Sequence, residues 1–203
     1  MFAGLLSTFL NDQLGRSDGS EIDISDDDSD ILDYISPISV FHSAVSSFYA
    51  LSDPSGLCGM HCEHIQSTLS WRSSGPQRDC VFVVEDEDKK GFRGMSVVCV
   101  KLFFSFTYEG DEYPCALVEW FKKVGRLPDK QTGMWVVKPE EDHHGTRLTS
   151  VVHLDTIVRG AHLIPVFGKG FLPPNFHHNW SLDSFKAFFV NKYADHHANE
   201  IAF

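Results

Sequence analysis

Four side chains of the kind that bind metal ions lie close together in the sequence: Cys58, His61, Cys62 and His64. Two thiols and two imidazoles are a ligand set that zinc accepts. A structural Cys2His2 site takes one pair of ligands from each of two separated elements, whereas here all four fall within seven residues. This spacing favours a loop and a short helix with incidental ligands. We therefore expect no metal site and no cofactor.

The tripeptide Asp195-His196-His197 superficially matches the DHH signature of a manganese-dependent phosphoesterase family. Such a site needs further carboxylates at the ends of parallel strands. No βαβ series precedes the tripeptide, so we interpret the match as a coincidence. The chain also lacks a nucleophile elbow, a phosphate-binding loop, a dinucleotide fingerprint and the H-E-x-x-H motif. The sequence thus predicts no catalytic residue, no small-molecule substrate and no enzyme.

Basic side chains near aromatic ones form a third group of candidates. Contact with nucleic acid or with a protein partner is expected at Lys122, Lys123, Arg126 and Trp135, with Lys130, Arg147 and Trp120 as further members. The net charge of −11 is unevenly distributed, because residues 1–36 carry −8 and the rest only −3. Strong non-specific binding to phosphates needs clustered cations on a basic body. Nucleic-acid binding is therefore the alternative and not the first hypothesis.

The element that must organise these residues is a β-hairpin at residues 101–120. Leu102, Phe104 and Phe106 alternate with Phe103, Ser105 and Thr107, and after the polar segment at 109–112 the alternation resumes. Gly110 with Asp111 supplies the tight turn. Since both faces of the ribbon carry apolar side chains, both need cover from other segments.

The remaining pattern predicts a mainly β fold (α+β): a small, strongly bent antiparallel sheet or partly open barrel with two or three short helices. We expect a single domain at residues 36–203 after an acidic, mostly disordered arm at 1–35, in which residues 2–14 could form one short helix. Strands are expected at residues 79–85, 94–100, 134–137, 151–154, 162–167 and 188–193. Helical segments are expected at 37–50, 156–161 and 181–187.

The cysteines and the apolar start of the chain bear on its location. Five cysteines without framework spacing favour a reducing compartment. The segment MFAGLLSTFL lacks a basic flank and is too short to span a bilayer, so we expect neither a signal peptide nor a membrane segment. An intracellular protein is the resulting expectation.

Five blocks of the sequence carry a resemblance to a known family: FHSAVSSFYALSDPSG, YPCALVEWF, PDKQTGMWVV, VVHLDTIVRGAHLIPVFG and FFVNKYADHHANEIAF. In this order and spacing, residues 36–203 resemble the C-terminal region of fungal Plavaka-type, CACTA-like DNA transposases. The chain departs from that pattern at Cys58, His61 and Cys62, where relatives carry glycine and arginine. The resemblance implies that the RNase H-like catalytic domain is not part of this chain.

Three hypotheses follow from these observations. The resemblance implies a non-catalytic transposon-derived module, nuclear if functional, that contacts protein or chromatin and has a protein partner or the parent transposase as its target. By analogy of fold alone, its short strands are similar to BAH modules of chromatin proteins. The alternatives are a nucleic-acid-binding accessory module of a transposase and a transposon remnant without function.

Overall fold

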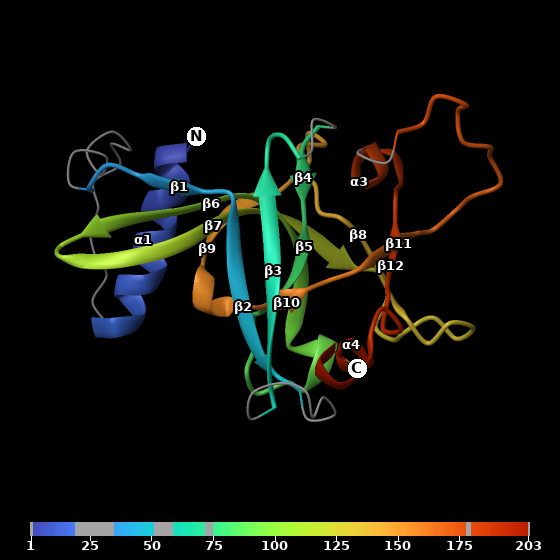
Figure 1. Ribbon diagram of the computed structural model, residues 1–203, viewed down its shortest axis with the longest axis horizontal. Helices are drawn as coiled ribbons and strands as arrows, with labels where there is room; N and C mark the ends of the chain where they lie inside the picture. Colours follow the sequence, from blue (N-terminus) through green and yellow to red (C-terminus); the bar gives the residue numbers. More distant parts are fainter. Residues whose placement is uncertain (1, 19–34, 51–58, 72–74, 178–179, 203) are drawn as a thin grey trace.

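The computed structural model describes residues 2–18, 35–50, 59–71, 75–177 and 180–202, and antiparallel strands make up most of its regular secondary structure (Figure 1). Its strands are β1 (Ser39–Phe41), β2 (Ser43–Tyr49), β3 (Met60–Thr68), β4 (Gln77–Arg78), β5 (Cys80–Val84), β6 (Met95–Tyr108), β7 (Asp111–Lys123), β8 (Trp135–Pro139), β9 (Thr149–His153), β10 (Ile157–Gly160), β11 (Leu163–Pro165) and β12 (Phe188–Val190). Its helices are α1 (Phe2–Asp18), α3 (Ser181–Ser184) and α4 (His196–Ala202), with 3-10 turns η1 (Gly91–Arg93) and η2 (Leu154–Thr156).

The strands form one large sheet and one small sheet. The large sheet runs β10-β5-β6-β7-β8-β12-β11, with β1 paired to β6 and β9 paired to β7, and the small sheet runs β2-β3-β4. The large sheet curls strongly and forms a half-barrel. The expected fold class, a mainly β, strongly bent antiparallel sheet with a few helices, is therefore confirmed.

The long hairpin of β6 and β7 is the centre of the large sheet, as the alternation predicted (Figure 1). Its turn differs by one residue from the expected position, because Tyr108 pairs with Asp111 and the two turn residues are Glu109 and Gly110. Both have positive φ angles, 54° at Glu109 and 98° at Gly110. This geometry is typical of a type I′ hairpin turn, which matches the twist of the flanking strands.

Three apolar clusters cover the two faces of this hairpin. On one face, Val97 belongs to the cluster around Phe121 and Phe188, and Phe104 belongs to the cluster beneath α1. On the other face, Phe103 packs in a third cluster. The register shifts between Val100 and Leu102, so Lys101 is the extra residue of a β-bulge. The bulge leaves Lys101 on the same face as the first two clusters.

Helix α1 belongs to the folded body, which corrects the expected arm at residues 1–35. Leu6 and Leu10 are fully buried, and Phe9 lies edge-on to Phe106 with ring centroids 6.4 Å apart. The apolar residues of α1 supply the cover that this face of the hairpin required, so the helix is longer than expected and docked. Residues 19–34, the most acidic part of the expected arm, lie outside the described residues.

Residues 37–50 form strands β1 and β2, so the helix expected there was wrong. Phe41, Ala44, Val45 and Phe48 recur at helical spacing, but the buried side chains of β2 follow the two-residue period of a strand. Strand β2 pairs along its whole length with β3, where a loop and a short helix were expected. Pairing with a distant segment outweighs a weak local periodicity.

Secondary structure in the C-terminal third of the chain differs from the sequence-based prediction in two places. Residues 157–160 form strand β10 and only the preceding residues 154–156 form a helical turn, whereas a helical turn was expected over 156–161. The tail after the expected closing strand, for which no element was predicted, contains α4. The Arg159 side chain, 5% exposed, donates through Nη1 to Asp195 Oδ1 at 3.0 Å, and Ala198 N donates to the same oxygen at 2.7 Å. This ion pair ties the start of α4 to β10.

Candidate functional site

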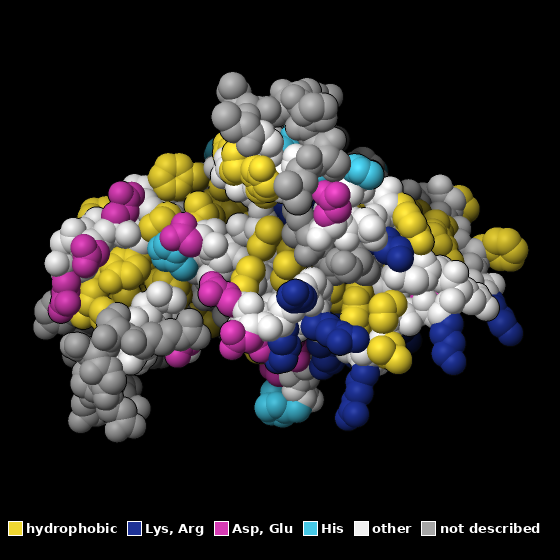
Figure 2. Space-filling view, turned by 90° about the horizontal axis from the view of Figure 1, so that it is seen from below, with side chains coloured by type: hydrophobic (Ala, Val, Ile, Leu, Met, Phe, Trp, Pro, Cys, Tyr) yellow, Lys and Arg dark blue, Asp and Glu magenta, His cyan; other side chains and the backbone are white. Residues whose placement is uncertain are grey.

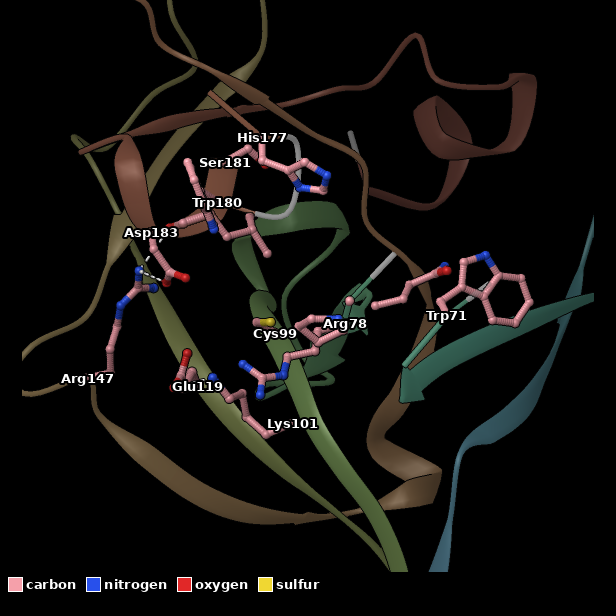
Figure 3. Close-up of a pocket in the computed structure, with 14 residues that line it drawn as sticks. Trp71, Arg78, Cys99, Lys101, Glu119, Arg147, His177, Trp180, Ser181 and Asp183 are labelled. Carbon is pink, nitrogen blue, oxygen red and sulfur yellow. Dashed lines mark hydrogen bonds and ion pairs between the residues drawn. The ribbon is translucent and has the colours of Figure 1, made fainter. Parts of the chain in front are cut away.

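A cleft of about 590 Å³ opens between the hairpin, strand β4 and helix α3 (Figure 3). Its floor comes from β6 and β7, one wall from the segment at 75–78, and the other wall from residues 180–183. Among the lining residues are three cations (Arg78, Lys101 and Arg147), two carboxylates (Glu119 and Asp183) and three aromatic side chains (Trp71, His177 and Trp180). Figure 3 shows Arg147 and Trp71 at opposite ends of the cleft.

The floor of the cleft carries Cys99, Lys101 and Glu119 on one face of the sheet. Cys99 pairs directly with Glu119, so the two side chains share one face of the sheet. Lys101, two residues after Cys99 in the same strand, lies on that face as well, and Lys101 Nζ lies 2.7 Å from Glu119 Oε1. Both side chains are only about one-fifth exposed, at 23% and 17%. A charged pair thus interrupts an otherwise apolar face, and it does so where the cleft opens.

The cation on the α3 side is also paired. Arg147 Nη2 donates to Leu182 O at 2.9 Å and to Asp183 Oδ1 at 3.2 Å, which anchors α3 against the rim. Arg78, in contrast, has no carboxylate partner among the described residues. Figure 3 shows its guanidinium extending towards Lys101 and Glu119 in the middle of the cleft. Arg78 is therefore the cation that is available to an incoming acidic group.

Two tryptophans border the cleft and remain accessible. Trp71 is 37% exposed, and Trp180 is 52% exposed with its ring centroid 6.1 Å from that of His177. Tryptophan is enriched among the residues that dominate protein interfaces, because a large rigid surface is buried at low entropic cost. The cleft therefore combines one unpaired cation with two open aromatic surfaces.

The described side chains among the four candidate metal ligands do not converge. Cys58 lies outside the described residues. On β3, neighbouring side chains point to opposite faces: the His61 ring lies tilted against the Phe48 ring with centroids 5.4 Å apart, and Cys62 Sγ lies 3.3 Å from Ser47 Oγ. Within the described part of the chain, no group of three or more His, Cys, Asp or Glu residues is arranged to hold a metal ion. His64 instead lines a second pocket, beside Asp79 and Arg159.

The four residues expected to contact nucleic acid or a partner differ in how accessible they are in the structure. Trp135 is 5% exposed in the core, so the expectation was wrong for this residue. Lys123 lies 4.9 Å from the centroid of the Phe92 ring, and its burial lowers the pKa of its amine. Lys122 lies 3.9 Å from Glu140, which leaves the exposed Arg126 as the most accessible of the four.

Acidic and basic side chains are nevertheless separated along the long axis of the molecule. Figure 2 shows Asp and Glu side chains mainly towards the left end, and Lys and Arg side chains towards the right end. The acidic end includes the hairpin tip with Glu109, Asp111 and Glu112, which are all exposed. At the other end, Lys192 Nζ approaches Gly133 in the loop between β7 and β8. Basic side chains thus also gather at one end of the molecule, in addition to the three that line the cleft.

No family model, curated protein or solved structure matches this chain. The resemblance to Plavaka-type transposases therefore stays a prediction. In the part of the chain that the structure describes, the helices are too short or too polar to cross a bilayer.

The sequence contained a partial signal for the cleft. Lys101 and Glu119 are charged residues within strands of alternating apolar character, and such residues need a special environment. Arg78, Trp71 and Trp180 come from short or irregular segments that have no periodicity. Only the tertiary fold brings these three to the same site.

Proposed function

We propose that this chain is a non-catalytic protein-binding module whose cleft takes an extended peptide segment with an acidic side chain next to an aromatic or apolar one. The observation that carries this proposal is the position of Arg78, an unpaired cation of the described residues, in a cleft bordered by Trp71 and Trp180. An acidic side chain of the ligand would pair with Arg78. Its apolar neighbour would pack on one of the tryptophans.

The mixed charge of the cleft favours a peptide over a nucleic acid as the occupant. Lys101 is paired with Glu119 and Arg147 with Asp183, so the cleft carries both signs of charge. Phosphate backbones require several unpaired cations in a row, and carboxylates beside them oppose binding. Peptides, in contrast, are recognised by mixed clefts in which a few polar groups fix the orientation.

The wider role is part of the same proposal. The five sequence blocks support an origin in the C-terminal region of a fungal transposase, and this origin would make the parent transposase or a chromatin protein in the nucleus the partner. A BAH-like role is an analogy that rests on the mainly β half-barrel alone. Sequencing the flanking genome tests the origin, because the proposal expects an upstream RNase H-like region or terminal repeats.

Selection from a displayed library of random peptides tests the binding function. The full chain should enrich peptides in which Asp or Glu lies beside an aromatic or apolar residue. Arg78→Glu should abolish this preference, and Trp180→Ala should weaken binding of a selected peptide by about tenfold, which corresponds to about 1.4 kcal/mol. Arg126→Glu is the matched control, since it makes the same charge change on an exposed residue that does not line the cleft.

Three results would count against the proposal. The first is enrichment that is the same for the native chain and Arg78→Glu. The second is binding of duplex or single-stranded DNA at low salt that Arg78→Glu abolishes, because this would assign the cleft to nucleic acid. The third is cleavage of DNA with magnesium or manganese that is lost when acidic residues of the cleft are replaced, because this would make the chain an enzyme.

A further inference from the structure

Cys80 on β5 and Cys99 on β6 face each other across the sheet. Cys80 O accepts a hydrogen bond from Ala161 N at 2.7 Å, on the side away from β6. Because the N–H and C=O of a strand residue point to the same side, Cys80 makes no backbone bond to Cys99. The adjacent bond, from Val100 N to Asp79 O at 3.0 Å, agrees with this pattern. The cysteines therefore occupy a non-hydrogen-bonded pair.

This position brings the two thiols within bonding reach. The Cα atoms of a non-hydrogen-bonded antiparallel pair are about 4.5 Å apart, with both side chains on the same face. Disulfides form at Cα separations of about 4.4 to 6.8 Å. The backbone therefore already meets the main condition for a bridge between Cys80 and Cys99, and both are reduced in the structure.

The cleft connects this pair to solvent. Cys99 is 4% exposed but lines the floor of the cleft, beside Lys101 and Glu119. Cys80 is 8% exposed and lines the second pocket, on the other side of the pair. A small oxidant can therefore approach Cys99 through the cleft, whereas a protein thiol cannot reach it.

The surroundings shift the pKa values of the two thiols in opposite directions. The hydrogen bond with Cys80 lowers the pKa of Cys99; burial opposes this effect and the nearby ammonium of Lys101 adds to it. The same hydrogen bond, together with burial, raises the pKa of Cys80 well above its usual value. Cys99 is thus the sulfur that ionises first, and Cys80 keeps its proton until a second step. Thiolates are the reactive form of cysteine.

We propose that Cys80 and Cys99 are a redox-active dithiol that hydrogen peroxide converts into a cross-strand disulfide. The Cys99 thiolate attacks one peroxide oxygen, the O–O bond breaks, and the departing hydroxide takes up the proton that Cys99 released. Cys99 is then a sulfenic acid. The Cys80 sulfur attacks the Cys99 sulfur, the S–S bond forms, the S–O bond breaks, and the second hydroxide takes the Cys80 proton. Two thiols and one peroxide give one disulfide and two waters.

The other described cysteines differ from this pair. Burial raises the pKa of Cys115 to about 12, and the residue is 1% exposed, so its thiol is inert. Cys62 is exposed, but the residue opposite it on β2 is Ser47. Within the described residues, the geometry therefore assigns an internal disulfide to Cys80 and Cys99.

Thiol mapping of the full chain tests the proposal. Reduced protein carrying Cys58→Ser and Cys62→Ser is treated with hydrogen peroxide, catalase removes the excess, and free thiols are blocked with N-ethylmaleimide in denaturant before proteolysis and mass spectrometry. We expect a peptide pair linked through Cys80 and Cys99, lighter by two hydrogen atoms, and a blocked Cys115. Dithiothreitol should restore both thiols. A linked pair that includes Cys115, or complete blocking of Cys80 and Cys99 after peroxide treatment, would overturn the proposal.

Variants separate the two steps. In Cys80→Ser, oxidation should stop at Cys99 sulfenic acid, which dimedone traps, whereas Cys99→Ser should give no dimedone adduct at Cys80. Cys115→Ser is the matched control, a buried cysteine replaced at a distance from the pair, and should form the disulfide as the parent does. Equal dimedone labelling of the Cys80→Ser and Cys99→Ser variants would contradict the assigned order. These readouts do not depend on peptide binding.

Discussion

Replacing Leu10 with alanine should loosen helix α1 from the sheet. Leu10 is fully buried in the cluster that contains Phe104 and Phe106. A buried Leu→Ala change costs about 2–5 kcal/mol in the free energy of unfolding, because apolar surface is lost and a cavity is left. In a chain of this size each kcal/mol lowers the melting temperature by about 2–4 °C. We therefore expect the melting temperature to fall by about 4–20 °C.

Two measurements check this prediction. Denaturant unfolding followed by far-ultraviolet circular dichroism gives the free energy of unfolding, and hydrogen exchange shows where protection is lost. Asp12→Ala is the matched control, since Asp12 lies on the exposed side of the same helix and its replacement should change stability by less than about 0.5 kcal/mol. If Leu10→Ala and Asp12→Ala unfold alike, α1 does not contribute to the core and our description of this face is incorrect.

Four further predictions concern other parts of the fold. Phe104→Asp should prevent folding, because it places an unpaired charge at a site that is 1% exposed, and Phe104→Leu should still give soluble protein with cooperative melting. Asp195→Asn should lower the free energy of unfolding by about 1–3 kcal/mol and speed hydrogen exchange in α4, since Arg159 loses one of its two carboxylate partners and keeps Glu63. Partial burial opposes ionisation of Asp195, yet the hydrogen bonds from Arg159 keep its pKa below the usual value. The contribution of ionised Asp195 to the free energy of unfolding is complete above about pH 4 and disappears as pH falls through the lowered pKa. The free energy of unfolding should therefore fall less steeply with acid in Asp195→Asn than in the native chain. Gly94→Ala should destabilise the turn before β6, because a Cβ there would lie 2.3 Å from Asp86 O, and its melting temperature should fall relative to Gly168→Ala, where the space is open.

The central hairpin could be predicted from the sequence because its information is local. Strict alternation over Leu102 to Phe106, followed by a glycine turn and renewed alternation, specifies two strands and their register within a one-residue error at the tip. The mainly β class and strands β5, β8, β9, β11 and β12 follow from the same kind of signal. These segments pair with neighbours whose patterns agree with their own.

The tertiary structure decided the remaining features: strands β2, β3 and β10, the docking of α1, and the cleft. The apolar residues of β2 fit a helix and a strand equally well, and only pairing with β3 selects the strand. The β-bulge at Lys101 is visible only when β6 and β7 are paired, and it places Leu102 on the same face as Lys101. Cys80 and Cys99 are nineteen residues apart and become neighbours only through that sheet register. Local periodicity thus determines the strands whose alternation is clear, whereas pairing decides the ambiguous segments and register decides which side chains meet, because opposing residues come from distant parts of the chain.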